Sequence, residues 1–293
     1  MIPPPAFLAS EPIRSAAAES FFHVIPVPFE QSVSYGAGTA QGPQAILAAS
    51  SQLELFDGRS QPAELGIHTT DAIDCRGSAE TVLNRIEERC RTVLAAGVLP
   101  VLLGGEHTVS VGALRAIRTA YPGPIGLFQL DAHADLRDSY EGSRLSHACV
   151  ARRAHQDLGM TLFQFGVRAL CLEEHRYREE HAIARLDAAA IHRDGVAALA
   201  VPNSFPDRIY LSLDVDGLDP AVIRATGTPV PGGPGWYDTL AALETVIAGR
   251  QVVGFDVVEL APRDDDHASA FAAAQLVYAV MGMIQRNRGA MVI

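Results

Sequence analysis

The sequence predicts an α/β fold, a three-layer α/β/α arrangement around a mostly parallel central sheet. Apolar runs of strand length alternate with segments of helical periodicity along all 293 residues. Most runs are continuously apolar, which is typical of parallel strands covered on both faces. No internal repeat or long linker divides the chain, so we expect one domain over residues 1–293, with residues 1–20 as an extended N-terminal segment.

Six apolar runs are expected to form the strands of this sheet. In chain order they are Phe22–Val27, Val98–Leu103, Ile125–Leu130, Thr161–Val167, Arg208–Leu213 and Val252–Val258. Ligands of parallel sheets bind outside the carboxyl ends of the strands, where the loops carry the chemistry. The residues directly after each run are therefore the first candidates for a functional site.

Several helices have readable ends. Ser78 is a suitable N-cap for a helix whose apolar residues recur at helical spacing, and Gly97 ends that helix. Pro43 suits a first helical turn and opens a helix over Gln44–Leu55. The segment Ala268–Gln285 has no formal charge but contains polar side chains, so we expect a buried core helix and no membrane span.

Composition excludes several classes of protein. Hydrophobic residues make up 48% and charged residues 19% of the chain, which provides for a packed core. A formal net charge of -11 argues against nucleic acid as a partner, because phosphates need a basic surface. The chain has four cysteines, none of them in a CxxC pair: Cys75, Cys90, Cys149 and Cys171. We therefore expect neither a zinc finger nor a disulfide framework. Scattered thiols are typical of a reducing compartment, so we expect a cytoplasmic location.

Three of the expected strands are followed by side chains of the kind that bind metals. The segments are Gly104-Gly105-Glu106-His107, Asp131-Ala132-His133-Ala134-Asp135 and Asp214-Val215-Asp216. Residues two apart in an extended chain point the same way, so Asp131, His133 and Asp135 are expected to project together, as are Asp214 and Asp216. Each motif alone is weak, since a lone D-x-D is more often a solvated turn. Their occurrence together at equivalent strand ends favours a single site.

The charges of this set predict bound metal. Converging carboxylates repel one another, and two divalent cations would balance the four negative charges. Oxygen-rich ligands without a thiolate favour Mn²⁺, with other divalent ions as alternatives. A water molecule between two cations becomes a nucleophile near neutral pH, so the ligand set predicts a hydrolase.

The three motifs resemble the metal-binding motifs of the ureohydrolases, the arginase and agmatinase family. Further similarities lie in residues 34–39 with Gly42-Pro43, in Leu218-Asp219-Pro220, in residues 226–229 and in residues 254–259. The resemblance implies an arginase-like fold, two Mn²⁺ ions and a homo-oligomer, a trimer or hexamer. It also implies six metal ligands: His107, Asp131, His133, Asp135, Asp214 and Asp216.

The same resemblance implies two catalytic residues. Glu259 would be the carboxylate that binds the guanidinium group of a small cationic substrate, because a fork of N–H donors matches a carboxylate. His147 matches the family's proton-shuttling histidine. The alternatives are a surface glutamate at a strand end and a histidine that merely begins a helix. Asp256 lies three residues before Glu259 and is not expected to share its strand face, so we assign it no catalytic role.

The loop after Asp135 departs from the arginases, which have Asn and Ser residues there to hold the amino-acid head of arginine. Residues 136–143 resemble the agmatinase branch instead, which favours hydrolysis of agmatine to putrescine and urea. Trp236 and Tyr237 either line the path of the alkyl chain or simply pack. Alternatives are a ureohydrolase for guanidinobutyrate, aminopropylagmatine, formimidoyl-glutamate or guanidine, and a non-catalytic member that binds metal and guanidinium. A deacetylase on the related fold is less favoured, because one zinc would leave several carboxylates unused.

Overall fold

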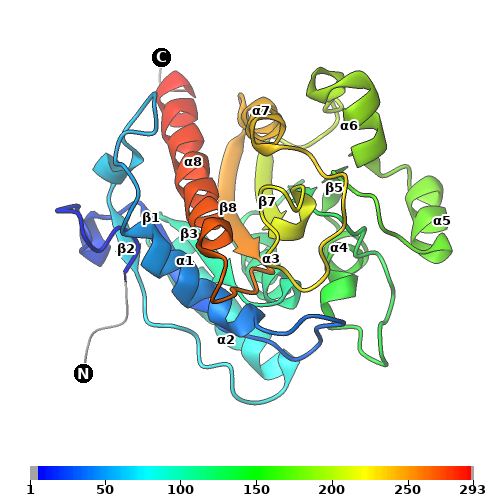
Figure 1. Ribbon diagram of the computed structural model, residues 1–293, viewed down its shortest axis with the longest axis horizontal. Coiled ribbons are helices and arrows are strands. Elements are labelled where there is room, and N and C mark those ends of the chain that lie inside the picture. The colour runs from blue at the N-terminus through cyan, green and yellow to red at the C-terminus, as the bar shows by residue number, and fades with distance from the viewer. Residues whose placement is uncertain (1–5, 292–293) are drawn as a thin grey trace.

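A computed structural model describes residues 6–291 and confirms the α/β/α architecture (Figure 1). The central sheet has eight strands in the order β2-β1-β3-β8-β7-β4-β5-β6. Every pair of neighbouring strands is parallel. The strands are β1 (Phe22–Val27), β2 (Ile67–Thr69), β3 (Leu99–Gly104), β4 (Gly126–Leu130), β5 (Thr161–Phe165), β6 (Ala184–Leu186), β7 (Arg208–Asp214) and β8 (Gln251–Val258).

Helices cover both faces of the sheet, and each face has its own buried apolar cluster. The cluster on one face includes side chains of α1 (Gly42–Ser50), α6 (Ala188–Asp194), α7 (Trp236–Ile247) and α8 (His267–Met291). The cluster on the other face includes side chains of α2 (Ala79–Ala95), α3 (Ser110–Ala120), α4 (Val150–Arg152) and α5 (Leu172–Glu180). The sheet is therefore the middle layer of three.

The expected elements are present, with shifted ends. Ser78 caps α2 by accepting a hydrogen bond from the backbone N–H of Thr81 at 3.3 Å, as its position predicted. The helix predicted over Gln44–Leu55 ends at Ser50, because Leu53 N–H turns back to the Ser50 carbonyl at 3.1 Å. The short strands β2 and β6 were not predicted. They have three residues each and lie at the two edges of the sheet, where an apolar run is too short to stand out.

Helix α8 contains the uncharged segment Ala268–Gln285. By length and composition alone it would suffice to cross a membrane, but 61% of its most apolar window is buried inside the protein. It lies beside α1, and Leu276, Val280 and Met281 are fully buried in the core (Figure 1). The prediction of a core helix is confirmed.

The N-terminal segment contributes to the core before the first strand. Residues 1–5 lie outside the described part of the chain. From residue 6 to residue 20 the only regular element is a short 3₁₀ turn, Ala17–Glu19. Phe7 and Leu8 are buried, so this stretch is anchored against the sheet and its helices.

Candidate metal centre

Four strands at the centre of the sheet, β3, β8, β7 and β4, lie side by side. Because all are parallel, their carboxyl ends meet at one edge, and the residues that follow them come together there. His107 follows β3, Asp131 follows β4, and Asp214 ends β7. The expectation that these distant segments form a single site therefore follows from the strand order.

One group of ligand-type atoms surrounds the His107 ring. Its Nδ1 lies 3.3 Å from an oxygen of Asp131, 2.9 Å from one of Asp135 and 3.3 Å from one of Asp214. All these side chains are buried. One histidine nitrogen and three carboxylate oxygens at this spacing form a pocket for a cation.

A second group surrounds His133. Its Nδ1 lies 3.0 Å from Asp216 Oδ2 and 3.6 Å from Asp131 Oδ1. The ligand atoms of His107, Asp131 and Asp214, and likewise those of Asp131, His133 and Asp216, lie within 4.8 Å of one another. Asp131 belongs to both groups and faces each with a different oxygen, so the arrangement suits two adjacent ions that share this carboxylate.

The hydrogen bonds of His107 show that a cation fits the first group. Its Nε2 lies 2.9 Å from Ser212 Oγ, and that hydroxyl donates its only hydrogen to Asp256 at 2.8 Å. Ser212 therefore accepts from Nε2–H, which leaves a lone pair on Nδ1 of the neutral ring. Nδ1 is buried, faces three carboxylates and has no hydrogen-bond partner. When a cation replaces the proton that Nδ1 would otherwise carry, this lone pair gains a partner, and a ring fixed in this way by its second nitrogen is typical of a metal-ligating histidine.

A row of buried polar side chains lies beneath the ligands, at one level across the sheet. Gln164 pairs with Gln129, Gln129 with Ser212, and Ser212 with Asp256 in the registers of adjacent strands. Gln164 donates to Gln129 at 2.7 Å, and Gln129 donates to Asp131 Oδ2 at 2.8 Å. The row thus orients Asp131 from one side and His107 from the other. It was not predicted, although each member interrupts an otherwise apolar strand, and that signal was available.

The local geometry differs from the expected alternation in an extended chain. Asp135 has a left-handed backbone with φ 51°, and Asp216 lies in a 3₁₀ turn that Asp214 caps by accepting from Asp216 N at 2.9 Å. The side chains converge because the chain turns sharply after each strand. The expected convergence is present, but the expected reason for it was wrong.

In the absence of metal, the pKa values of the ligand side chains differ from their ordinary values, because the side chains are buried and lie close to other charged groups. Burial, with Asp131 nearby, raises the pKa of Asp135 to about 7. Burial, with Asp216 nearby, raises the pKa of Asp214 well above its ordinary value. Burial alone would lower the pKa of His133, but contacts with Asp131 and Asp216 outweigh it and raise that pKa to about 12. Without cations, therefore, protons on the imidazoles partly balance the carboxylates.

Glu259 follows β8 at the centre of the same edge of the sheet. It lines a small cavity together with His107, Asp214 and Asp216. Its backbone is left-handed, with φ 65°, a conformation that costs a non-glycine residue about 1–2 kcal/mol. Its Oε1 accepts a hydrogen bond from the backbone N–H of His107 at 2.6 Å. Burial raises the pKa of Glu259 to about 8. The strained turn directs a buried carboxylate toward the metal ligands.

His147 reaches the cavity from a different loop, at the start of the short 3₁₀ turn His147–Cys149. Its Nε2 lies 2.9 Å from Ser34 Oγ, and its ring meets that of Tyr140 edge-on at 5.7 Å between centroids. Burial lowers the pKa of His147. The neutral ring is therefore favoured near neutral pH, which suits a group that takes up and releases a proton.

A second cavity, of about 340 Å³, shares lining residues with the cavity that Glu259 lines, but Glu259 is not in its lining. Its lining includes His133, Asp135 and His147 together with Arg137 and Tyr140 from the loop after Asp135. Trp236 and Tyr237 are not in this lining; Tyr237 is 81% exposed and Trp236 packs against the core. Trp236 therefore packs, as one of the two interpretations held, whereas Tyr237 is largely exposed at the start of α7 and does not line this cavity.

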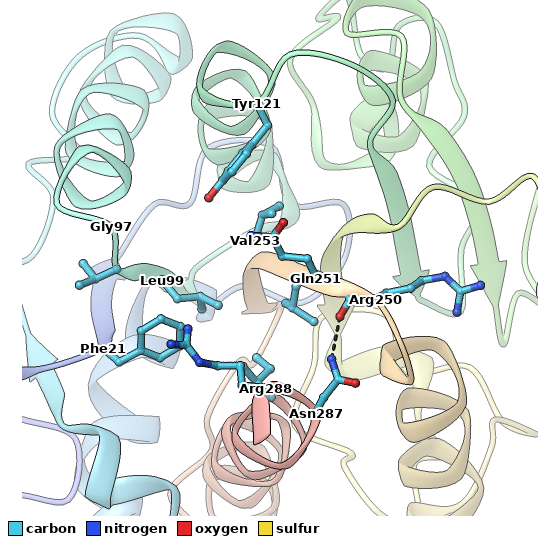
Figure 2. A pocket seen from close by; sticks show the side chains of 12 residues that line it. Phe21, Gly97, Leu99, Tyr121, Arg250, Gln251, Val253, Asn287 and Arg288 are labelled. Carbon is cyan, nitrogen blue, oxygen red and sulfur yellow. Dashed lines mark hydrogen bonds between the residues drawn. The ribbon is translucent and has the colours of Figure 1, made fainter. Parts of the chain in front are cut away.

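Another hollow, of about 270 Å³, lies at the amino ends of β3 and β8, at the opposite edge of the sheet (Figure 2). Leu99, Gln251 and Tyr121 are in its lining, and Asn287 donates to the Arg250 carbonyl at 2.7 Å beside it. Its lining contains no histidine or carboxylate. It offers no metal ligands, and the candidate site is the one at the carboxyl ends.

We predict that cation binding by the metal-free protein strengthens with pH. A cation must displace protons from imidazoles whose pKa values the carboxylates have raised, so acid competes with metal. Affinity for Mn²⁺ should rise about tenfold per pH unit for each proton displaced, between about pH 6 and pH 8. Calorimetry in buffers of different ionisation enthalpy would count the released protons, and an affinity that is independent of pH would show that the imidazoles are already free.

Comparison with known proteins agrees with this geometry. A family model described as the arginase family matches residues 21–282. The N(1)-aminopropylagmatine ureohydrolase of Thermus thermophilus is 38% identical over 89% of each protein. The agmatinase of Pyrococcus horikoshii is 34% identical over 90% of this chain and 92% of that protein. The crystal structure of an agmatine ureohydrolase from Thermoplasma volcanium superposes with a TM-score of 0.84 at 28% identity, over 94% of both chains.

These matches cover the sheet, the helices of both faces and all the loops that carry the cluster. The chain is therefore a hydrolase that belongs to the arginase family.

Proposed function

We propose that this protein hydrolyses agmatine to putrescine and urea. One observation carries the proposal: five of the six expected metal ligands, together with Glu259 and His147, line one cavity. Guanidine hydrolysis requires a centre that activates water, a carboxylate that holds the guanidinium and a group that carries a proton to the leaving amine. Because its product is a diamine, the enzyme would act in polyamine biosynthesis.

Two Mn²⁺ ions are the cofactors that we propose. His107, Asp131, Asp135 and Asp214 would hold one ion, and His133 and Asp216 would hold the other, with Asp131 shared. Bound together, the ions would activate a water molecule as nucleophile and stabilise the charge that develops during attack. Oxygen-rich ligation without sulfur favours Mn²⁺ over ions that prefer thiolates.

Glu259 would bind the guanidinium group. One of its oxygens is occupied by the His107 N–H, which fixes the carboxylate in place and leaves the other oxygen for the substrate. Burial raises the pKa of Glu259, so its charged form is disfavoured while the site is empty. A bound guanidinium would stabilise the charged carboxylate, so substrate binding and ionisation of Glu259 favour each other. The substrate's reactive carbon would then lie beside the metal ligands.

His147 would carry the proton that the leaving amine needs. Its Nε2 is directed toward Ser34, and both side chains line the cavity with the ligand cluster. A ring that is mostly neutral near pH 7 can take up a proton at Nε2 and give it to the amine nitrogen as the C–N bond breaks.

The far end of the substrate would lie along residues 136–143. Relatives named for agmatine and for aminopropylagmatine both exist, and the open cavity of about 340 Å³ admits either tail. Arg137 lines the cavity, its guanidinium lies 5.2 Å from the Tyr140 ring centroid, and no carboxylate among the described residues pairs with it. This cation favours a second candidate, a guanidine with an acidic tail such as guanidinobutyrate.

We further propose a cytoplasmic homo-oligomer, a trimer or hexamer. The four cysteines are all free thiols, as expected in a reducing compartment.

Urea release across a panel of guanidines, with Mn²⁺ added, tests the choice of substrate. If Arg137 does not pair with the α-carboxylate of arginine, agmatine should exceed arginine in kcat/KM by at least about 100-fold, because burying that carboxylate without a partner costs about 3 kcal/mol. Aminopropylagmatine and guanidinobutyrate complete the panel. Preference for guanidinobutyrate would assign Arg137 to the tail, and comparable efficiency on agmatine and arginine would show that residues 136–143 do not select against the carboxylate.

Glu259→Gln and His147→Ala should fail in different ways. The amide of Gln keeps the shape of Glu259 but loses the ionic attraction, so KM should rise and kcat should fall together. Loss of His147 should lower kcat by about 10²–10⁴-fold with little change in KM. Steady-state kinetics with a pH profile separates the two patterns. Turnover of His147→Ala at the parent rate would mean that solvent carries the proton.

A further inference from the structure

A chain of hydrogen bonds runs from Glu106 through Ser32 to Nδ1 of His147, the ring nitrogen that does not face Ser34. Glu106 immediately precedes His107 and is fully buried, yet its carboxylate binds the loop at residues 31–32. Glu106 Oε1 accepts from Ser32 Oγ at 2.7 Å and from Thr108 Oγ1 at 2.6 Å, while Oε2 accepts from the backbone N–H groups of Gln31 and Ser32 at 2.5 and 2.6 Å. Ser32 Oγ in turn lies 3.1 Å from His147 Nδ1.

Hydrogen counting at Ser32 sets the direction of this chain on the Nδ1 side. On the Nε2 side, Ser34 Oγ would donate to the ring at 2.9 Å in preference to Tyr140, which is 3.4 Å away. A serine hydroxyl has one hydrogen, and Ser32 donates it to Glu106. Toward His147 the same oxygen can only accept, which it does from the His147 backbone N–H at 3.1 Å. The remaining contact, with Nδ1, is favourable only if Nδ1 carries a hydrogen. Ser146 Oγ, at 3.3 Å from Nδ1, can accept from it as well.

We propose that Glu106 and Ser32 form a positioning relay that holds His147 with a hydrogen on Nδ1 and the Nε2 lone pair directed into the cavity. The inference rests on the proposed role of His147 and deepens it. His147 would gain and lose one proton at Nε2 in each turnover, while the other hydrogen stays on Nδ1, which donates it to Ser32 Oγ. Neither Glu106 nor Ser32 would contact the substrate.

The negative charge of Glu106 adds to this effect. When Nε2 takes up a proton the ring becomes a cation, and a carboxylate two hydrogen bonds away stabilises it. Burial lowers the pKa of His147, and Glu106 is the strongest influence that opposes this shift. The relay would therefore orient the ring and keep its protonated form accessible.

The chain offers a clean variant. Ser32→Ala removes the hydroxyl but leaves Glu106 bonded to both backbone N–H groups and to Thr108, so the loop stays tethered. Ser32→Thr restores a hydroxyl, and Ser146→Ala removes the neighbouring hydroxyl that is not bonded to Glu106. This trio separates the relay from a purely structural role.

Steady-state kinetics of the metal-loaded enzyme, on the panel guanidine that it turns over best, should show kcat of Ser32→Ala reduced at least about tenfold with KM nearly unchanged. Ser32→Thr should recover most of the rate, and Ser146→Ala, which removes only the longer of the two Nδ1 contacts, should lose clearly less than Ser32→Ala. In a His147→Ala background, Ser32→Ala should cause no further loss. A parental kcat for Ser32→Ala, or an equal loss with and without His147, would overturn the relay.

A readout that needs no activity keeps the relay distinct from the proposed function. With Zn²⁺ as a diamagnetic ion, two-bond ¹H–¹⁵N correlation spectra of labelled histidines report which ring nitrogen carries the hydrogen, and His147→Ala assigns the signal. The parent should show Nδ1 protonated, and Ser32→Ala should show a mixture of tautomers. An unprotonated Nδ1 in the parent would overturn the relay. If no guanidine releases urea but Nδ1 is protonated as expected, the proposed function fails and the relay stands.

Discussion

The carboxylates of Asp131, Asp135, Asp214 and Asp216 meet around two imidazole rings in the buried centre of the site, and their repulsion has to be balanced. Two like charges about 4 Å apart repel by about 4 kcal/mol at an effective dielectric constant near 20. Two protonated histidines can supply only half of the compensating charge. Divalent cations would supply the rest and release those protons.

The sheet brings these carboxylates together and holds them in place. The strand order brings β3, β8, β7 and β4 together, so one segment from each reaches the same edge. Beneath them, on four adjacent strands, Gln164 donates to Gln129 and Gln129 donates to Asp131, while Ser212 donates to Asp256. Each of these hydrogen bonds avoids the cost of an unsatisfied buried polar group, about 1–3 kcal/mol. Together they hold Asp131 and His107 before any ion arrives.

Much of this could be predicted from the sequence, because strands and metal ligands leave strong local signals. Continuous apolar runs located the six longer strands, and the D-x-H-x-D and D-x-D motifs located the ligand-type side chains. Long-range contacts left weaker signals. Ser32 meets Glu106 across 74 residues and His147 across 115. The left-handed backbones of Asp135 and Glu259 were also beyond reach, since side chains at φ above zero are set by tertiary packing.

The central claim is that paired cations on this cluster activate water against a guanidinium group. Titration of the metal-free protein with Mn²⁺, with urea release from agmatine and bound metal measured in the same samples, tests it most directly. Urea formation should be negligible without metal and reach its plateau at about two ions per chain. A plateau at about one ion, or urea release without any metal, would contradict the claim.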